Sequence, residues 1–167
     1  MSRKLSISPD VSYVLGIYQC GGSHANLHLY TTSKEMVERF VKIVVMSLDT
    51  RTDFINITQE QDMTKAEVKN SKLKKLLDDA LERRDQIFKY KNEYSGSYFA
   101  AMFDCNGAID ARGAFVRGMR SYDKILLERL GFHTATNAGR CYVRKSTDFI
   151  EFIKPFSIRA KSALRKR

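Results

Sequence analysis

The chain has 167 residues, 43% of them hydrophobic, which is enough to bury a core without disulfides or structural metals. No stretch approaches the roughly 20 apolar residues that cross a membrane, and the N-terminal segment lacks the apolar run of a secretory signal. The three cysteines are too few and too scattered for a disulfide framework, which favours a reducing, cytoplasmic setting. These features exclude a membrane protein and a disulfide-stabilised secreted domain.

The net charge of +10 is unevenly distributed along the chain. Residues 1–106 carry 15 Lys and Arg against 14 Asp and Glu, whereas residues 107–167 carry 14 against 5. Basic side chains collected on one part of a fold are typical of proteins that bind a polyanion. We therefore expect a nucleic acid as partner; the alternative is that the charge serves only solubility.

The first half of the chain is predicted to be mainly helical. An apolar helix covers residues 13–22, an amphipathic helix with Ser33 as its N-cap covers residues 33–48, and a long helix runs from residue 64 to about 91. Residues 23–32 indicate a short hairpin segment, residues 53–58 one strand, and residues 92–97 a linker.

The second half alternates helices and hairpins. A helix over residues 98–107 is followed by a hairpin at 108–119 and a helix from Ser121 to Gly131. Strand-like runs at 132–137 and 140–145 enclose a turn signal. A helix then begins at Ser146 and stops before Pro155, and residues 158–167 form a last basic helix. The predicted order is helix, hairpin, helix, hairpin, helix.

Two of these helical segments nearly repeat each other. Residues 13–23, YVLGIYQCGGS, and residues 98–108, YFAAMFDCNGA, lie 85 positions apart. Each carries small residues at a spacing of four, Gly16 and Cys20 in the first, Ala101 and Cys105 in the second, so that one face of each helix allows close approach. A repeat at half the chain length predicts two modules related by a pseudo-two-fold axis, with these residues at the interface.

The repeated segments resemble the paired motifs of the LAGLIDADG homing endonuclease family. Residues 99–107 align with all nine letters of the motif, and residues 14–22 match more loosely. The resemblance implies an α+β fold of two pseudo-symmetric modules in a single compact chain. We place the first module, with a linker helix, at residues 1–94, and the second, with a basic C-terminal tail, at residues 95–167.

The resemblance also implies a metal-binding acid just before the last glycine of each motif, and both acids are absent. Gly21 has no side chain and Asn106 offers a neutral carbonyl oxygen, whereas a hard cation prefers anionic oxygen ligands. We therefore regard both as degenerate catalytic positions and expect no catalytic residue, no metal, no cofactor and no enzymatic activity. His24 and His28 share one face of a predicted strand, but without a third ligand nearby we interpret them as surface or core residues.

Basic side chains of the second module are the predicted nucleic-acid contacts. In the strand at 140–145, Arg140, Tyr142 and Arg144 share the outer face, where arginines beside an aromatic ring suit phosphate contact and base stacking. The alternative is an ordinary solvated strand face. The full predicted set is Arg112, Arg117, Arg120, Arg140, Tyr142, Arg144, Lys145, Arg159, Lys161, Arg165, Lys166 and Arg167.

Three functions remain open from the sequence. The first is a monomeric nucleic-acid-binding protein that has lost nuclease activity. Structured RNA (ribosomal or intron RNA) is slightly favoured over duplex DNA, because the hairpins expected at residues 23–32 and 108–120 are shorter than the strands that the family it resembles lays in the DNA major groove, and because the positive charge is concentrated in one half of the chain. That family also includes RNA-splicing maturases. The second is an active DNA endonuclease in which a displaced acid such as Asp104 or Asp110 binds the metal; Asp104, however, lies about 200° around the helix from residue 106 and should point elsewhere. The third is a structural component of a larger ribonucleoprotein assembly.

Overall fold

A computed structural model describes residues 4–21 and 26–165 of the chain, and it is an α+β structure. The first half contains α1 (Pro9–Cys20), β1 (Leu27–Thr31), α2 (Lys34–Met46), a 3₁₀ turn (Thr52–Phe54), β2 (Ile55–Glu60), β3 (Met63–Val68), α3 (Ser71–Glu82) and α4 (Arg84–Ile87). The second half contains α5 (Glu93–Asn106), β4 (Gly107–Asp110), β5 (Gly113–Arg117), α6 (Ser121–Arg129), β6 (Thr134–Asn137), β7 (Arg140–Val143), α7 (Ser146–Ile153) and α8 (Ile158–Arg165).

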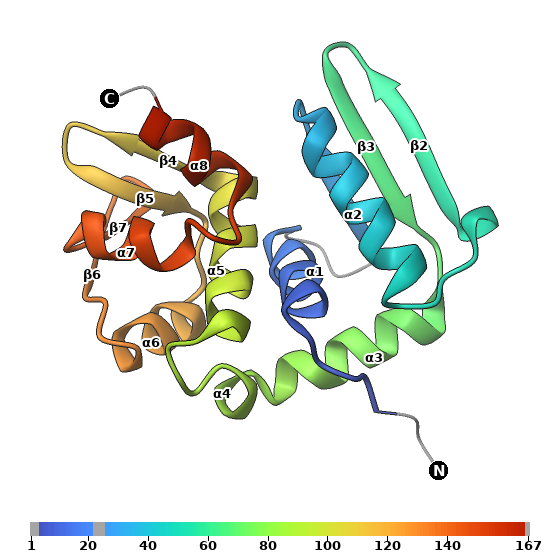
Figure 1. Ribbon diagram of the computed structural model, residues 1–167, viewed down its shortest axis with the longest axis horizontal. Coiled ribbons are helices and arrows are strands. Elements are labelled where there is room, and N and C mark those ends of the chain that lie inside the picture. Colours follow the sequence, from blue (N-terminus) through green and yellow to red (C-terminus); the bar gives the residue numbers. More distant parts are fainter. Residues whose placement is uncertain (1–3, 22–25, 166–167) are drawn as a thin grey trace.

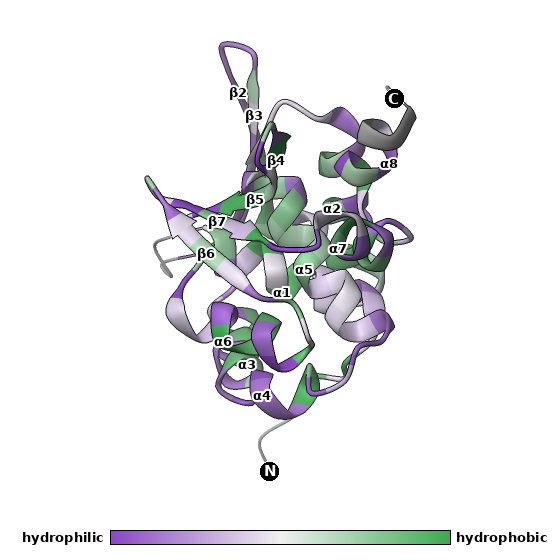
Figure 2. Cartoon of the chain, turned by 90° about the vertical axis from the view of Figure 1, so that its left-hand side faces the viewer, coloured by the Kyte–Doolittle hydropathy of each residue, from purple (hydrophilic) through white to green (hydrophobic). Residues whose placement is uncertain are grey.

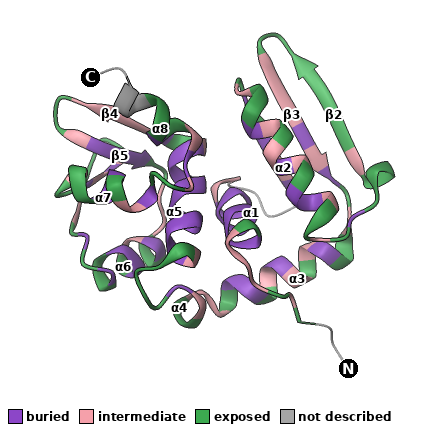
Figure 3. Cartoon of the chain, in the orientation of Figure 1, coloured by how far each residue is buried: buried purple, intermediate pink, exposed green. Residues whose placement is uncertain are grey.

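The two motif helices, α1 and α5, pack side by side at the centre of the molecule (Figure 1). Their approach is so close that a Cβ atom added at Gly16 would lie 2.4 Å from the backbone oxygen of Tyr98 and 2.7 Å from Cβ of Ala101. Tyr13 on α1 donates a hydrogen bond of 2.6 Å to Asp104 on α5. Figure 3 shows that these two helices form the most buried part of the fold.

An antiparallel sheet lies on each side of this helix pair. One has the strand order β1-β3-β2 and the other β4-β5-β7-β6. Alternation along the strands buries one face of each sheet against helices: Leu27, Leu29, Ala66 and Val68 face α2, whereas Ala114 and Val116 of β5 face α5 and α7, and Cys141 and Val143 of β7 are buried on the same face of their sheet. In Figure 2 the strands lie on one side of the molecule and most of the helices on the other. Both sheets therefore keep an open face.

Most of the predicted elements are present. Ser33 accepts a hydrogen bond from the backbone N–H of Met36 and begins α2 as predicted. The predicted hairpin at residues 108–119 is the β4–β5 pair, and Ala138 and Gly139 form the predicted turn between β6 and β7 with φ angles of 51° and 76°. The proposed division at residues 94/95 falls inside the first turn of α5 and remains a proposal.

Three local predictions are wrong. Residues 64–68 belong to β3 rather than to a helix. Of the hairpin expected at residues 23–32, residues 27–31 form the single strand β1, which pairs with the distant β3, and residues 22–25 lie outside the described residues. Residues 93–97 are the first turns of α5 rather than a linker. Asn92 begins this helix by accepting hydrogen bonds from the backbone N–H groups of Tyr94 and Ser95, a capping signal that is present in the sequence.

Candidate nucleic-acid interface

The C-terminal ends of α1 and α5 open into a cleft of about 310 Å³, which we call the motif cleft. Its lining includes Ile17, Cys20, Gly21, His28, Cys105 and Asn106. Asn106 is exposed, and Gly21 lies beside the imidazole of His28. The two degenerate motif positions therefore meet at one cleft, although neither offers a carboxylate. These donors do not fit the paired-carboxylate metal site that the motif resemblance implies.

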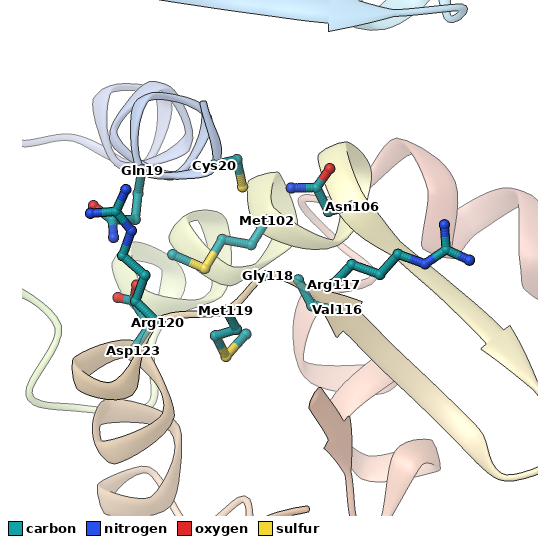
Figure 4. Close-up of a pocket in the computed structure, with 10 residues that line it drawn as sticks. All are labelled: Gln19, Cys20, Met102, Asn106, Val116, Arg117, Gly118, Met119, Arg120 and Asp123. Atoms are coloured by element: carbon teal, nitrogen blue, oxygen red, sulfur yellow. The ribbon is translucent and has the colours of Figure 1, made fainter. Parts of the chain in front are cut away.

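A second, smaller cavity of about 20 Å³ lies beside the motif helices, and it has room for about one water molecule. Figure 4 shows Gln19, Arg120 and Asp123 together at one end of it, with Arg117 extending away. Burial raises the pKa of the Asp123 carboxyl, whereas the Tyr98 hydroxyl, which donates to it at 2.8 Å, and Arg84 at 3.3 Å oppose that change. Two arginines near Asp123 make a cation site here unfavourable.

Asp104 on α5 is 2% exposed and is not among the residues that line the motif cleft. Its carboxylate accepts hydrogen bonds from the hydroxyls of Tyr13 and Ser157 and from the backbone N–H groups of Ile158 and Arg159. It thereby caps the N-terminus of α8 and joins this helix to both motif helices. Because this one carboxylate accepts from four donors, Asp104 is not available to replace the acid that is missing at position 106. The sequence predicted that Asp104 points away from that position.

Asp110 ends β4 on the open face of the second sheet. Its Oδ2 atom accepts hydrogen bonds from the Tyr142 hydroxyl at 2.6 Å and from Arg140 Nη1 at 2.9 Å. The hydrogen bond from Tyr142 is the main cause that lowers the pKa of Asp110 below its usual value. Arg140 also lies over the ring of Phe115, at 4.6 Å from its centroid. Asp110 thus holds Arg140 and Tyr142 in place, and the positive charge of Arg140 compensates the charge of its ionised carboxylate.

The other predicted contact residues fall into three groups. Arg112, Arg117, Arg144 and Lys145 are exposed at the ends of β-strands in the second sheet; Arg120 is half-buried and donates to the Tyr122 hydroxyl at 3.4 Å; and Arg159 and Lys161 are exposed on α8. Lys166 and Arg167 lie outside the described residues, as does the side chain of Arg165.

Two of these arginines converge on the end of α5. Arg117 and Arg159 line a cleft of about 180 Å³ together with Asn106, and the Arg159 guanidinium donates to the backbone oxygen of Gly107. The structure thus brings a residue from β5 and a residue from the basic tail to one motif position, although they are 42 positions apart in sequence. Periodicity within single elements could not reveal this convergence.

The open face of the first sheet contains polar residues that the sequence reasoning missed. The register places His28 opposite Glu67 and Tyr30 opposite Lys65, and Tyr30 donates a hydrogen bond to Glu60. On β2, Asn56 and Thr58 share this face. The alternation of β1 was visible in the sequence, but the assignment of residues 64–68 to a helix hid the partner strand. This face is nearly balanced in charge, unlike that of the second sheet.

Comparison with known proteins agrees with this architecture. Solved structures of I-DmoI align with nearly the whole chain: the complex with DNA and Ca has a TM-score of 0.69 at 13% identity and covers 95% of this chain and 98% of the other. The complex with DNA and Mn has a TM-score of 0.67 at 15% identity and covers 89% and 96%. The chain has a LAGLIDADG homing endonuclease fold. No protein-family model and no curated protein matches the sequence.

From Gly21 and Asn106 we expected that the protein is not an enzyme. The structures that share its LAGLIDADG fold contradict this expectation. The solved structures that share its fold include variants of a protein described as a homing endonuclease, and complexes of that protein with DNA in the presence of manganese. The sequence argument weighed the two motif positions and, as possible replacements, Asp104, Asp110, His24 and His28, and its favoured interpretation gave none of them a catalytic role.

Two further observations bear on the described part of the LAGLIDADG fold. Among residues 4–21 and 26–165, no three His, Cys, Asp or Glu side chains lie close enough together to hold a metal ion. No helix among them is long and apolar enough to cross a membrane.

Proposed function

We propose that the protein is a DNA endonuclease of the LAGLIDADG fold that binds duplex DNA along the open faces of its two sheets and cuts it beside the motif cleft. The observation that carries this proposal is the alignment of 95% of the chain with a structure determined in complex with DNA. Two open sheet faces on one side of a rigid helix pair also form a long surface, of the kind that a duplex occupies.

The charge distribution supports this proposal. Arg117 and Arg140 project from the open face of the second sheet, and Arg117 and Arg159 flank Asn106 at the end of the motif helix. Guanidinium groups at these places suit phosphate oxygens, because their donors match phosphate geometry and their charge is permanent. The second sheet therefore provides most of the electrostatic attraction, and the near-neutral first sheet contributes mainly polar contacts to bases.

The proposal is tested by measuring binding and cleavage separately. Binding of the full chain to duplex DNA, hairpin RNA and single-stranded RNA is titrated over a range of salt concentrations. Cleavage is then followed on a library of genomic fragments with MgCl2 or MnCl2, by sequencing the new ends. We expect duplex DNA to bind most tightly and defined cuts to appear. Tighter binding of hairpin RNA would instead support the function first favoured by the sequence.

The matched variants are Arg117→Gln and Arg129→Gln. Arg117 lies at Asn106, whereas Arg129 lies on α6, where it is paired with Asp85 at 3.7 Å and is well exposed. Each variant removes one positive charge, so a general effect of net charge would affect both equally. Loss of affinity in the first variant only would identify the surface at Asn106 as the DNA-binding face, and equal loss in both would contradict the proposal.

A further inference from the structure

We propose that His28 is a catalytic residue of the motif cleft: its Nε2 atom takes the proton from the water molecule that attacks a DNA phosphodiester. This inference rests on the proposed endonuclease function and assigns a residue to its chemical step. It is independent of the two motif acids, which the chain lacks, and of Asp104 and Asp110, whose carboxylates are engaged elsewhere.

The imidazole of His28 occupies space that a side chain at position 21 would need. A Cβ atom added at Gly21 would lie 3.2 Å from Cε1 and 3.4 Å from Nε2 of His28. The distance to Cε1 is shorter than an ordinary Cβ contact and the distance to Nε2 is an ordinary one, so a Cβ alone would shift the ring by a few tenths of an ångström, and the further atoms of an aspartate would compete with the ring for the same space. The glycine at this motif position therefore makes room for the imidazole, and the two residues are structurally complementary.

The hydrogen bonding of His28 determines which ring nitrogen can accept a proton. Nδ1 lies 3.2 Å from the backbone oxygen of Asn26, and a carbonyl oxygen only accepts, so Nδ1 carries the hydrogen. In the neutral imidazole, Nε2 then has a free lone pair. The same Asn26 donates to Glu67, the residue opposite His28 on β3, at 3.0 Å. The backbone oxygen of Asn26 therefore orients the ring through Nδ1, and Nε2, the basic nitrogen, lies on the side of Gly21.

The position of His28 on a strand gives the ring a firm base. Leu27 and Leu29, its neighbours on β1, are both 2% exposed and belong to the core, so the backbone under His28 cannot shift easily. His28 itself is half-buried and lines the motif cleft together with Asn106. Catalytic groups are most precise when a rigid element holds them, and β1 meets this condition.

The motif cleft and the second cleft that adjoins it at Asn106 supply the other components of a hydrolysis step. The motif cleft's volume of about 310 Å³ is enough for a phosphodiester and a water molecule, and Arg117 and Arg159 lie beyond Asn106, where they can stabilise added negative charge on the phosphate. His28 takes one proton from water, and the water oxygen forms a bond to phosphorus. One ester P–O bond breaks, and its oxygen leaves as an alcohol after receiving a proton from solvent.

The test compares cleavage by the wild type with cleavage by His28→Ala and His28→Gln, on a DNA fragment that the wild type cuts, with MgCl2 or MnCl2. His133→Ala is the control, since the His133 side chain is 71% exposed, lies outside the lining of the motif cleft and is paired with Glu128 at 3.9 Å. General bases typically contribute about 10²- to 10⁴-fold, so we expect losses of that size in both His28 variants and none in the control. Duplex binding, measured separately, should change less than about threefold.

Added imidazole separates a catalytic from a structural role. Because His28→Ala leaves space beside Gly21, free imidazole should restore cleavage in that variant and not in His28→Gln, whose side chain fills the space. Unchanged cleavage in both variants, or a loss that imidazole never restores in a folded and DNA-binding His28→Ala protein, would overturn the role of His28 alone. Absence of any cutting by a wild-type protein that binds duplex DNA would overturn the proposed endonuclease function as well.

Discussion

Replacing Gly16 by alanine tests the close approach of the two motif helices. In a free helix this change would stabilise by about 0.5–1 kcal/mol, because glycine loses more backbone entropy on folding. Here the new Cβ atom would lie 2.4 Å from the backbone oxygen of Tyr98, whereas ordinary contacts begin near 3.4 Å. The helices would have to separate by about 1 Å, since the obstacle is backbone and cannot rotate away.

Overpacking of this kind costs about 1–3 kcal/mol, which exceeds the gain in helix propensity. We therefore expect Gly16→Ala to lower the free energy of unfolding by about 1–2 kcal/mol, and Tm by about 2–4 °C for each kcal/mol in a chain of this length. Gly96→Ala on α5 is the matched control: its Cβ would lie 2.7 Å from the ring edge of Phe156 and 3.5 Å from the ring of Phe152, and both are side chains, which can move, rather than backbone. The measurement is thermal unfolding by circular dichroism. A Tm for Gly16→Ala equal to or above that of Gly96→Ala would refute the reasoning.

Three further outcomes are expected. Asp104→Asn should lower the free energy of unfolding by about 2–4 kcal/mol, since an amide cannot accept from all four of its donors; urea titration that shows wild-type stability would count against the capping role. Tyr142→Phe should raise the pKa of Asp110 toward its ordinary value, measured by NMR titration of the carboxyl, because the main cause of its lowering is removed. The stability that the ionised Asp110 contributes is present at neutral pH and is lost as pH falls through its lowered folded-state pKa, so this acid-side loss should shrink in the variant. Arg117→Gln should make the log–log salt slope of duplex binding shallower by about 0.9, the value for one phosphate contact, and an unchanged slope would exclude that contact.

The sequence by itself determined the central helix pair and the unequal distribution of charge. Small residues at a spacing of four, repeated 85 positions apart, are a local pattern, and the packing of Gly16 against Ala101 follows from it. Strand alternation likewise predicted that Arg140 and Tyr142 share the outer face of their strand, and in the structure Cys141 and Val143, which alternate with them, are buried. Such features depend only on the periods of helices and strands, which are the same in every fold.

Only the tertiary structure decided what the polar side chains do. Asp110 and its partners Arg140 and Tyr142 are about 30 positions apart, and Asp104 meets α8 more than 50 positions away. β3 has too few apolar residues to show a strand period, and its pairing with β1 depends on the whole first module. His28 reaches the place left by Gly21 because β1 packs beside the end of α1. Hydrogen bonds and clefts bring together residues that are far apart in the sequence, so the periodicity of a single helix or strand cannot predict them.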